Sequence, residues 1–91
     1  EDMPTDQNDT NSSLGIYSLQ SGAYSVRVNA ELQKTNLIIA GFSARITELY
    51  KNNRVLYAVR IGYFDNKDDA WQVGSQIRTK LNLKTIVVTN S

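Results

Sequence analysis

The sequence predicts an α+β domain of the βαββαβ ferredoxin-like (RNP-like) fold, with a four-stranded antiparallel sheet and two helices on one face. Three observations predict this fold. The length of 91 residues is enough for one modest core. The periodicities typical of strands and helices follow one another in the order βαββαβ, and the sequence contains an internal repeat. A shift of forty residues aligns Tyr17 with Tyr57, Leu19 with Val59, Gly22 with Gly62, Tyr24 with Phe64, Ala30 with Ala70, Leu37 with Ile77 and Ile46 with Ile86. Two pseudo-repeated βαβ halves therefore share one sheet, whose other face is left open to solvent.

The first residues differ in composition from the rest of the chain. Residues 1–13 hold four acidic side chains, no basic one and the only proline, without a periodic apolar pattern. Such a segment buries too little apolar surface to order itself, so we expect a flexible acidic linker over 1–14 and the folded domain over 15–91. Because the chain opens at Glu1 rather than at a methionine, we also expect it to be cut from a longer protein.

The first strand is predicted over 16–21 by the alternation of apolar and polar residues, and Gly22 is expected to end it. Ser25 is expected to cap the first helix, which runs to about Ala40, and the next residue, a glycine, ends this helix. Gly22 and its repeat partner Gly62 each stand where a strand turns toward a helix. Both are expected to adopt a backbone conformation that is closed to residues with a Cβ.

Two further strands, 43–50 and 55–62, flank the sequence Lys-Asn-Asn-Arg at 51–54. Adjacent asparagines tolerate the left-handed backbone of tight hairpins, so the two strands are predicted to be antiparallel neighbours. The period of two in the second of these strands predicts three inward residues, Tyr57, Val59 and Ile61, and three outward residues, Leu56, Ala58 and Arg60.

The second helix is expected to begin after Asp65 or Asn66, either of which can cap it. Its single apolar stripe consists of Ala70, Val73, Gly74, Ile77 and Leu81. The last strand is β-branched and runs from about 84 to 89.

Three large apolar side chains lie off the apolar stripes of the two helices. For Leu32 and Ile39 of the first helix, two interpretations are open: they widen the buried stripe at its edge, or they contact a neighbouring molecule. Trp71 lies beside the stripe of the second helix and is expected to pack rather than to bind a ligand.

The charge and the residue types narrow the class of function. Residues 14–91 carry ten basic and five acidic side chains, a formal net charge of +5, which favours an acidic or polyanionic partner. The chain has no histidine and no cysteine, so it lacks the usual general base near neutral pH, thiolate nucleophiles and the commonest metal ligands. The acidic group Asp65, Asp68 and Asp69 is expected to cap a helix rather than to bind a metal. We therefore expect a non-catalytic domain without a cofactor or a metal.

Several short motifs occur in a fixed order: Gln20-Ser-Gly-Ala-Tyr24, Asn29-Ala30, Leu37, Gly41-Phe42, Tyr57-Ala-Val-Arg-Ile-Gly62-Tyr-Phe64 and Asp69-Ala70. In this order and spacing, residues 15–90 resemble the SPOR domain, or sporulation-related repeat. The resemblance implies the same fold and a peptidoglycan-binding module of bacterial envelope and cell-division proteins, which recognises glycan strands lacking stem peptides. It further implies a monomeric domain in the periplasm or cell envelope that targets its parent protein to the division septum, without nucleic acid binding or membrane insertion of its own.

The resemblance also places the glycan site on the open sheet face, with the glutamine of the first strand, Gln20, as a member. Further ligand contacts are expected from Ser18, Arg60, Arg45, Ala58, Tyr63 and Tyr50. Ala58 stands where the family often has a basic residue, and Tyr63 stands where it often has proline.

The chemistry of two of these residues suits a glycan without stem peptides. Gln20 offers two amide donors and an acceptor to the acetamido and hydroxyl groups of a sugar. Arg60 can hold a carboxylate by paired hydrogen bonds, and removal of the stem peptide exposes the lactyl carboxylate of each muramic acid. The alternative for Arg60 is a weak surface pair with Glu48.

Other classes of function remain as alternatives. RNA-recognition domains share this fold and bind single-stranded RNA on the open sheet face. The third strand here has Leu56, Ala58 and Arg60 outward, however, whereas those domains carry outward aromatic residues. No motif supports a small phosphatase of the ferredoxin-like plan or an amino-acid-sensing dimer. The parent protein can still carry a separate catalytic domain.

Overall fold

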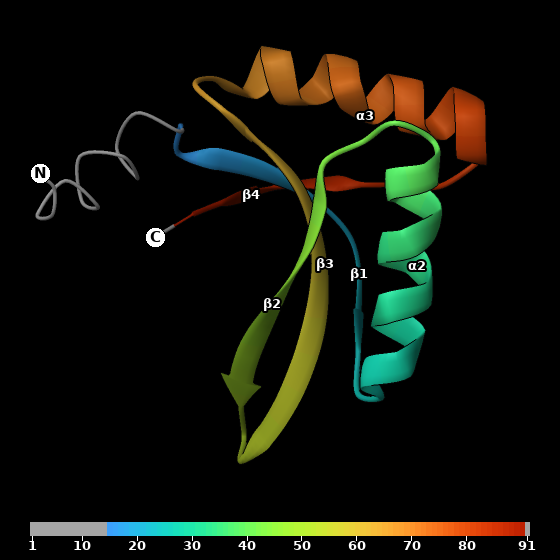
Figure 1. Ribbon diagram of the computed structural model, residues 1–91. Helices are drawn as coiled ribbons and strands as arrows, with labels where there is room; N and C mark the ends of the chain where they lie inside the picture. The colour runs from blue at the N-terminus through green and yellow to red at the C-terminus, as the bar shows by residue number, and fades with distance from the viewer. Residues whose placement is uncertain (1–14, 91) are drawn as a thin grey trace, which may run out of the picture.

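The computed structural model describes residues 15–90, which form six helices and strands (Figure 1). These elements are β1 (Tyr17–Tyr24), α2 (Arg27–Ile39), β2 (Ala44–Lys51), β3 (Arg54–Phe64), α3 (Lys67–Leu81) and β4 (Ile86–Thr89). All strand pairs are antiparallel, and the strand order across the sheet is β2-β3-β1-β4. This order confirms the predicted βαββαβ ferredoxin-like fold. The predicted linker lies outside the described residues.

Both helices cover the same face of the sheet, because their buried side chains enter one core. This core contains Ala30 and Leu37 of α2, Ala70 and Ile77 of α3, and Leu19, Val59 and Ile61 of the strands. Each fully buried aliphatic side chain contributes about 1.5–3 kcal/mol relative to an exposed one. Among the described residues, no helix covers the opposite side of the sheet, which we call the open face.

A β-bulge in β3 shifts the alternation of side chains, so that an odd-numbered residue before it and an even-numbered residue after it both face the core. The pairing with β1 is irregular between Ile61 and Phe64, and both of these side chains pack on the helix side. Tyr63, between them, points to the open face, where its ring contacts a β2 side chain. Gly62 forms the bulge with φ +70°, and a Cβ added there would lie 2.7 Å from Phe64 Cζ. The predicted need for glycine at position 62 is therefore confirmed.

The prediction for Gly22 is wrong in its mechanism. β1 does not end at this residue but continues to Tyr24, and Gly22 does not have a positive φ. A second irregularity, between Gln20 and Gly22, turns Ser21 toward α2, where its Oγ donates a hydrogen bond to Gln33 Oε1 at 2.6 Å. A Cβ on Gly22 would lie 3.0 Å from Tyr24 Oη and 3.1 Å from Gln33 Oε1. Close side-chain packing, not backbone conformation, explains this glycine.

Helix α2 begins and packs differently from the prediction. Its N-cap is Val26, which makes no side-chain cap hydrogen bond, so the predicted cap by Ser25 is wrong. The reason is that β1 ends three residues later than predicted, at Tyr24, which moves the connection and the helix start toward Arg27. Leu32 and Ile39 are 61% and 78% exposed, so they do not widen the buried stripe.

The β2–β3 hairpin has the predicted two-residue turn. Asn52 and Asn53 adopt φ 51° and 62°, as a type I′ turn requires, and Lys51 pairs with Arg54. The pairing of β1 with β3 ends at Tyr57, so the tip of the hairpin extends beyond β1 and is visible as the long two-stranded ribbon in Figure 1.

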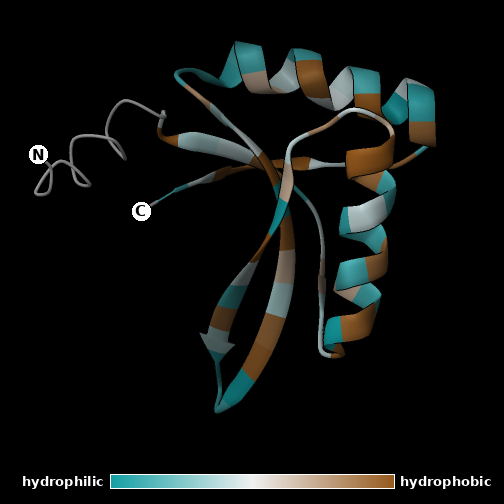
Figure 2. Cartoon of the chain, in the orientation of Figure 1, coloured by the Kyte–Doolittle hydropathy of each residue, from teal (hydrophilic) through white to brown (hydrophobic). Residues whose placement is uncertain are grey.

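Helix α3 follows the predicted pattern. Asn66 caps it by accepting a hydrogen bond from the Asp69 N–H at 2.9 Å, and Asn82 ends it in the left-handed conformation with φ 54°. Figure 2 shows hydrophobic and hydrophilic residues alternating along the helix, as expected of one that buries a single stripe. Within residues 15–90, no helix has the length and apolar content to cross a membrane.

Candidate functional site

Four side chains form a row across the open face, one from each strand. By register they are Arg45 (β2), Arg60 (β3), Gln20 (β1) and Ile86 (β4). Arg60 Nε donates a hydrogen bond to Gln20 Oε1 at 3.2 Å. The structure thus brings together three of the predicted site residues, Gln20, Arg60 and Arg45.

Arg45 is held in one orientation by four partners. Its Cζ lies 4.0 Å from the centroid of the Tyr63 ring, a cation–π contact. Nη1 donates to the Gly62 carbonyl at 3.0 Å, and Nη2 donates to Ser18 Oγ at 2.8 Å and to Asn90 Oδ1 at 3.2 Å. Asn90 was missed by sequence reasoning, because no motif marks it and its position follows only from the pairing of β4 with β1.

The row concentrates positive charge. Burial lowers the pKa of Arg45, Tyr63 raises it, and the neighbouring Arg60 cation lowers it again. Guanidinium groups nevertheless stay protonated in proteins near neutral pH, so the two adjacent arginines remain cations. Two cations side by side on an open surface attract an anionic group.

Ser18 has no surface with which to contact a ligand, since its exposed fraction is 0%. Its Oγ donates to the Gly62 carbonyl and accepts from Arg45 and, at 2.8 Å, from Asn90 Nδ2. The bulge at Gly62 directs a backbone carbonyl toward Ser18 and so creates this buried network. Ser18 therefore positions Arg45, in place of the predicted ligand contact.

Ala58 lies on the open face but is also fully covered by its neighbours, so it offers no side-chain surface of its own. Register places it between Thr47 of β2 and Ala23 of β1. Farther along, Leu49 faces Leu56. This part of the open face, which we call the floor, is therefore made of small and aliphatic residues. The outward positions Leu56, Ala58 and Arg60 of β3 lack the aromatic side chains that RNA-recognition domains use.

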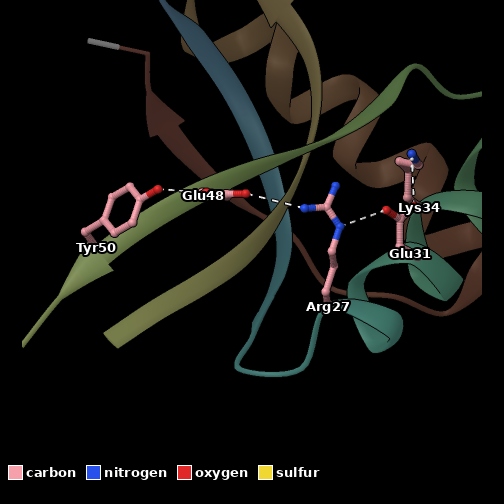
Figure 3. A network of polar contacts seen from close by, with 5 residues as sticks. All are labelled: Arg27, Glu31, Lys34, Glu48 and Tyr50. Carbon is pink, nitrogen blue, oxygen red and sulfur yellow. Dashed lines mark hydrogen bonds and ion pairs between the residues drawn. The ribbon is translucent and has the colours of Figure 1, made fainter. Parts of the chain in front are cut away.

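Tyr50 lies on the helix side of the sheet, away from the row. Its Oη donates to Glu48 Oε1 at 2.8 Å, and Arg27 of α2 donates to the other carboxylate oxygen at 3.4 Å (Figure 3). The hydrogen bond to Glu48 raises the pKa of Tyr50. Because Glu48 points toward α2, it does not pair with Arg60, which overturns the alternative predicted for that arginine.

Tyr63 is the exposed aromatic residue of the site. It is 44% exposed and supports the Arg45 guanidinium from one side. Its place on the open face depends on the bulge at Gly62, which a strict period of two does not predict.

The described residues contain no group of three histidine, cysteine, aspartate or glutamate side chains that could hold a metal ion. Asp68 and Asp69 lie in the first turn of α3, where negative charge stabilises the helix dipole.

The comparison with protein families decides the classification of this chain. The SPOR domain model matches residues 13–89, which is nearly all of the folded part. The chain belongs to the SPOR domain family. The predicted relationship and fold are thus confirmed.

Two solved SPOR-type structures share this fold. The SPOR domain of RlpA from Pseudomonas aeruginosa is 28% identical with a TM-score of 0.68, over 81% of this chain and 97% of that one. The peptidoglycan-binding domain of the B. subtilis cell wall lytic enzyme CwlC is 32% identical, also with a TM-score of 0.68, over 85% of this chain and 91% of that one. A search of curated proteins found no match to this SPOR domain.

Proposed function

We propose that this SPOR domain binds peptidoglycan glycan strands on its open face and catalyses no reaction on them. The observation that carries this proposal is the row of Arg45, Arg60 and Gln20 on a sheet surface that no helix of the described chain covers. The similarity to the peptidoglycan-binding domain of CwlC supports the same ligand class.

The preferred ligand is a glycan strand without stem peptides. Within residues 15–90, Arg60 uses Nε to bond Gln20, and its two Nη groups can take a carboxylate by paired hydrogen bonds. Only a strand that has lost its peptides presents the lactyl carboxylate of muramic acid, since the peptide otherwise masks it as an amide. The Gln20 amide N–H₂ group then donates to a sugar hydroxyl or acetamido oxygen.

The roles of the predicted residues differ in this arrangement. Gln20 and Arg60 contact the ligand, Tyr63 and Arg45 form the positive wall of the site, and Ser18 fixes Arg45 from below. The floor around Ala58 accommodates the apolar face of a sugar ring. Tyr50 lies on the helix side of the sheet and therefore takes no part in the site.

This binding would localise the parent protein in the cell and would not itself supply a catalytic activity. Peptide-free glycan concentrates at division septa, so the domain targets its parent protein to the septum from the periplasm or cell envelope. It acts as a monomer without a cofactor, and any catalysis belongs to another domain of the parent protein.

Cosedimentation with purified sacculi tests the proposal. We expect the protein to sediment with amidase-treated sacculi, which lack stem peptides, more than with untreated ones. Arg60→Gln should weaken binding by about 10-fold to 100-fold, because a hydrogen bond to a charged group contributes about 1.5–3 kcal/mol.

Arg54→Gln is the matched control, since Arg54 is an exposed arginine at the tip of the hairpin and outside the row. This variant should bind like the wild type. Absence of binding to both sacculus preparations would refute the ligand class. Equal binding to both preparations would refute the preference for peptide-free strands.

A further inference from the structure

A groove with a volume of about 610 Å³ separates α3 from β4. It lies at the β4 edge of the sheet, opposite the β2–β3 hairpin, and shares no residue with the polar part of the open-face row. One wall is a stripe of α3 that includes Trp71 and Arg78, and the other wall is the chain from Lys84 to Val87.

The β4 wall of the groove is a free strand edge. β4 pairs with β1 on one side, and within residues 15–90 no strand pairs with its other side. Its sequence, Ile-Val-Val-Thr, is β-branched and has no charge that would oppose strand addition. An extended peptide can therefore hydrogen-bond to this edge as a fifth strand.

Trp71 marks the helix wall as a contact surface. It is 71% exposed, against the expectation that it packs beside the apolar stripe. A large exposed indole next to a groove is typical of residues that dominate binding energy at interfaces.

The charge of the groove selects an acidic occupant. Its ionisable lining residues are Arg78 and Lys84, both cations, and none is acidic. A second copy docked edge to edge would add two more cations to the same place, which costs free energy. An acidic extended segment instead complements the groove.

We propose that the acidic segment of this chain, residues 1–13, binds in the α3–β4 groove beside β4. The segment contains Glu1, Asp2, Asp6 and Asp9 and no basic residue. This inference goes beyond the proposed glycan binding, which uses the open face.

The point of attachment makes the groove accessible to this segment. The Ile16 carbonyl accepts a hydrogen bond from the Asn90 N–H at 2.7 Å, so the described chain begins beside the C-terminal end of β4. The four residues of β4 span about 13 Å, whereas thirteen extended residues span up to about 45 Å. A tether this short also raises the effective concentration of the segment to about the millimolar range.

A spin label on the acidic segment tests this proposal in the full chain. The chain has no cysteine, so Thr5→Cys gives one labelling site. A nitroxide there should broaden the amide signals of Ile86 and Val87 and the indole signal of Trp71. The signals of the hairpin tip should keep their intensity.

Two double variants show whether charge holds the segment in place. Arg78→Gln with Lys84→Gln should abolish the broadening, and high salt should reduce it because the charges are exposed. Lys51→Gln with Arg54→Gln makes the same charge change at the hairpin tip and should leave the broadening intact.

Three results would overturn the proposal. The first is uniform broadening over the whole surface, or broadening centred on the open face. The second is broadening at β4 that persists in the double variant of the groove. The third comes from a mixture of two copies, one isotope-labelled without a nitroxide and the other carrying the nitroxide. Broadening of the first copy's signals by the second would make a second molecule the occupant. None of these results depends on glycan binding.

Discussion

Two arginines adjacent in the row have different roles because of their partners. Arg45 bonds to Gly62, Ser18 and Asn90 and lies against Tyr63, so its orientation is fixed by the protein. Within residues 15–90, Arg60 makes one side-chain hydrogen bond, through Nε. We infer that Arg45 provides a fixed positive charge and that Arg60 provides the adjustable contact to a ligand.

Removal of the Ser18 hydroxyl should destabilise the domain. Ser18→Ala leaves buried polar groups of Arg45 and Gly62 with one partner fewer, which costs about 1–3 kcal/mol. The midpoint temperature of thermal unfolding of Ser18→Ala should be lower than that of the wild type by at least about 4 °C for a domain of this size. Ser43→Ala, at an exposed serine, is the control and should shift the midpoint little. An unchanged midpoint in Ser18→Ala would mean that the buried network adds no stability.

The titration of Tyr50 should depend on Glu48. The hydrogen bond to the carboxylate raises the pKa of Tyr50, so its contribution to stability is present below the ordinary tyrosine pKa of about 10 and is lost as the pH rises through the higher folded value. Glu48→Gln should lower the pKa of Tyr50 toward the ordinary value, as measured by NMR titration of the ring. Glu31→Gln, which alters the same network without touching Tyr50, should leave it nearly unchanged. The reverse pattern would contradict the assigned contact.

At the scale of elements, the bulge in β3 organises both sides of the sheet. It turns Phe64 into the core, brings Tyr63 to the open face and aims the Gly62 carbonyl at Ser18 and Arg45. The corresponding irregularity of β1 turns Ser21 toward α2 instead. The two halves of the repeat therefore share an architecture but differ in function, since the bulge in β3 builds a wall of the site and the one in β1 anchors a helix.

Substitution of the bulge glycine should be more damaging than that of another glycine with positive φ. Gly62→Ala combines backbone strain with a Cβ placed 2.7 Å from Phe64, whereas Gly41 has φ +100° and nothing within 4 Å of an added Cβ. Gly41→Ala should cost about 1–3 kcal/mol from strain alone, and Gly62→Ala about 1–3 kcal/mol more. Urea unfolding measures both. Equal losses would show that Phe64 moves aside freely.

At the scale of the whole molecule, the N-terminal segment is acidic and the rest of the chain is basic. Residues 14–91 carry a net charge of +5, and residues 1–13 carry only acidic groups. Positive charge on the open face serves the proposed glycan, and positive charge in the α3–β4 groove serves the proposed acidic segment. The groove at the β4 edge shares Ile86 with the open-face row, but the charged members of the row lie on β2 and β3, so both surfaces can be occupied at once.

Salt dependence should distinguish the proposed ligand from RNA. A glycan held by one carboxylate contact at Arg60 should lose only about threefold in affinity between roughly 50 and 200 mM salt. An RNA bound through many phosphates would lose several orders of magnitude over the same range. A titration with a peptide-free glycan oligomer, with polyuridylate as the comparison, measures both. A steep loss for the glycan would mean that general charge attraction, and not a single clamp, holds it.

The sequence by itself determined the order of elements, the antiparallel hairpin at Asn52 and Asn53 and the shared outward direction of Gln20 and Arg60, and it narrowed the cap of α3 to Asp65 or Asn66. These features follow from residue spacing and from local backbone preferences, which act over a few neighbouring residues. The period of two in β2 also places Tyr50 on the face opposite Arg45, so the expected ligand contact of Tyr50 conflicts with the alternation of its own strand.

Only the tertiary structure decided which of the outward residues are accessible. Ser18 is buried because a bulge forty-four residues away brings the Gly62 carbonyl to it, and Asn90 joins the same network across seventy-two residues. Trp71 is exposed because nothing in residues 15–90 covers the outer edge of β4. Strand register, bulges and the burial of sheet residues depend on contacts between distant parts of the chain, so local periodicity does not predict them.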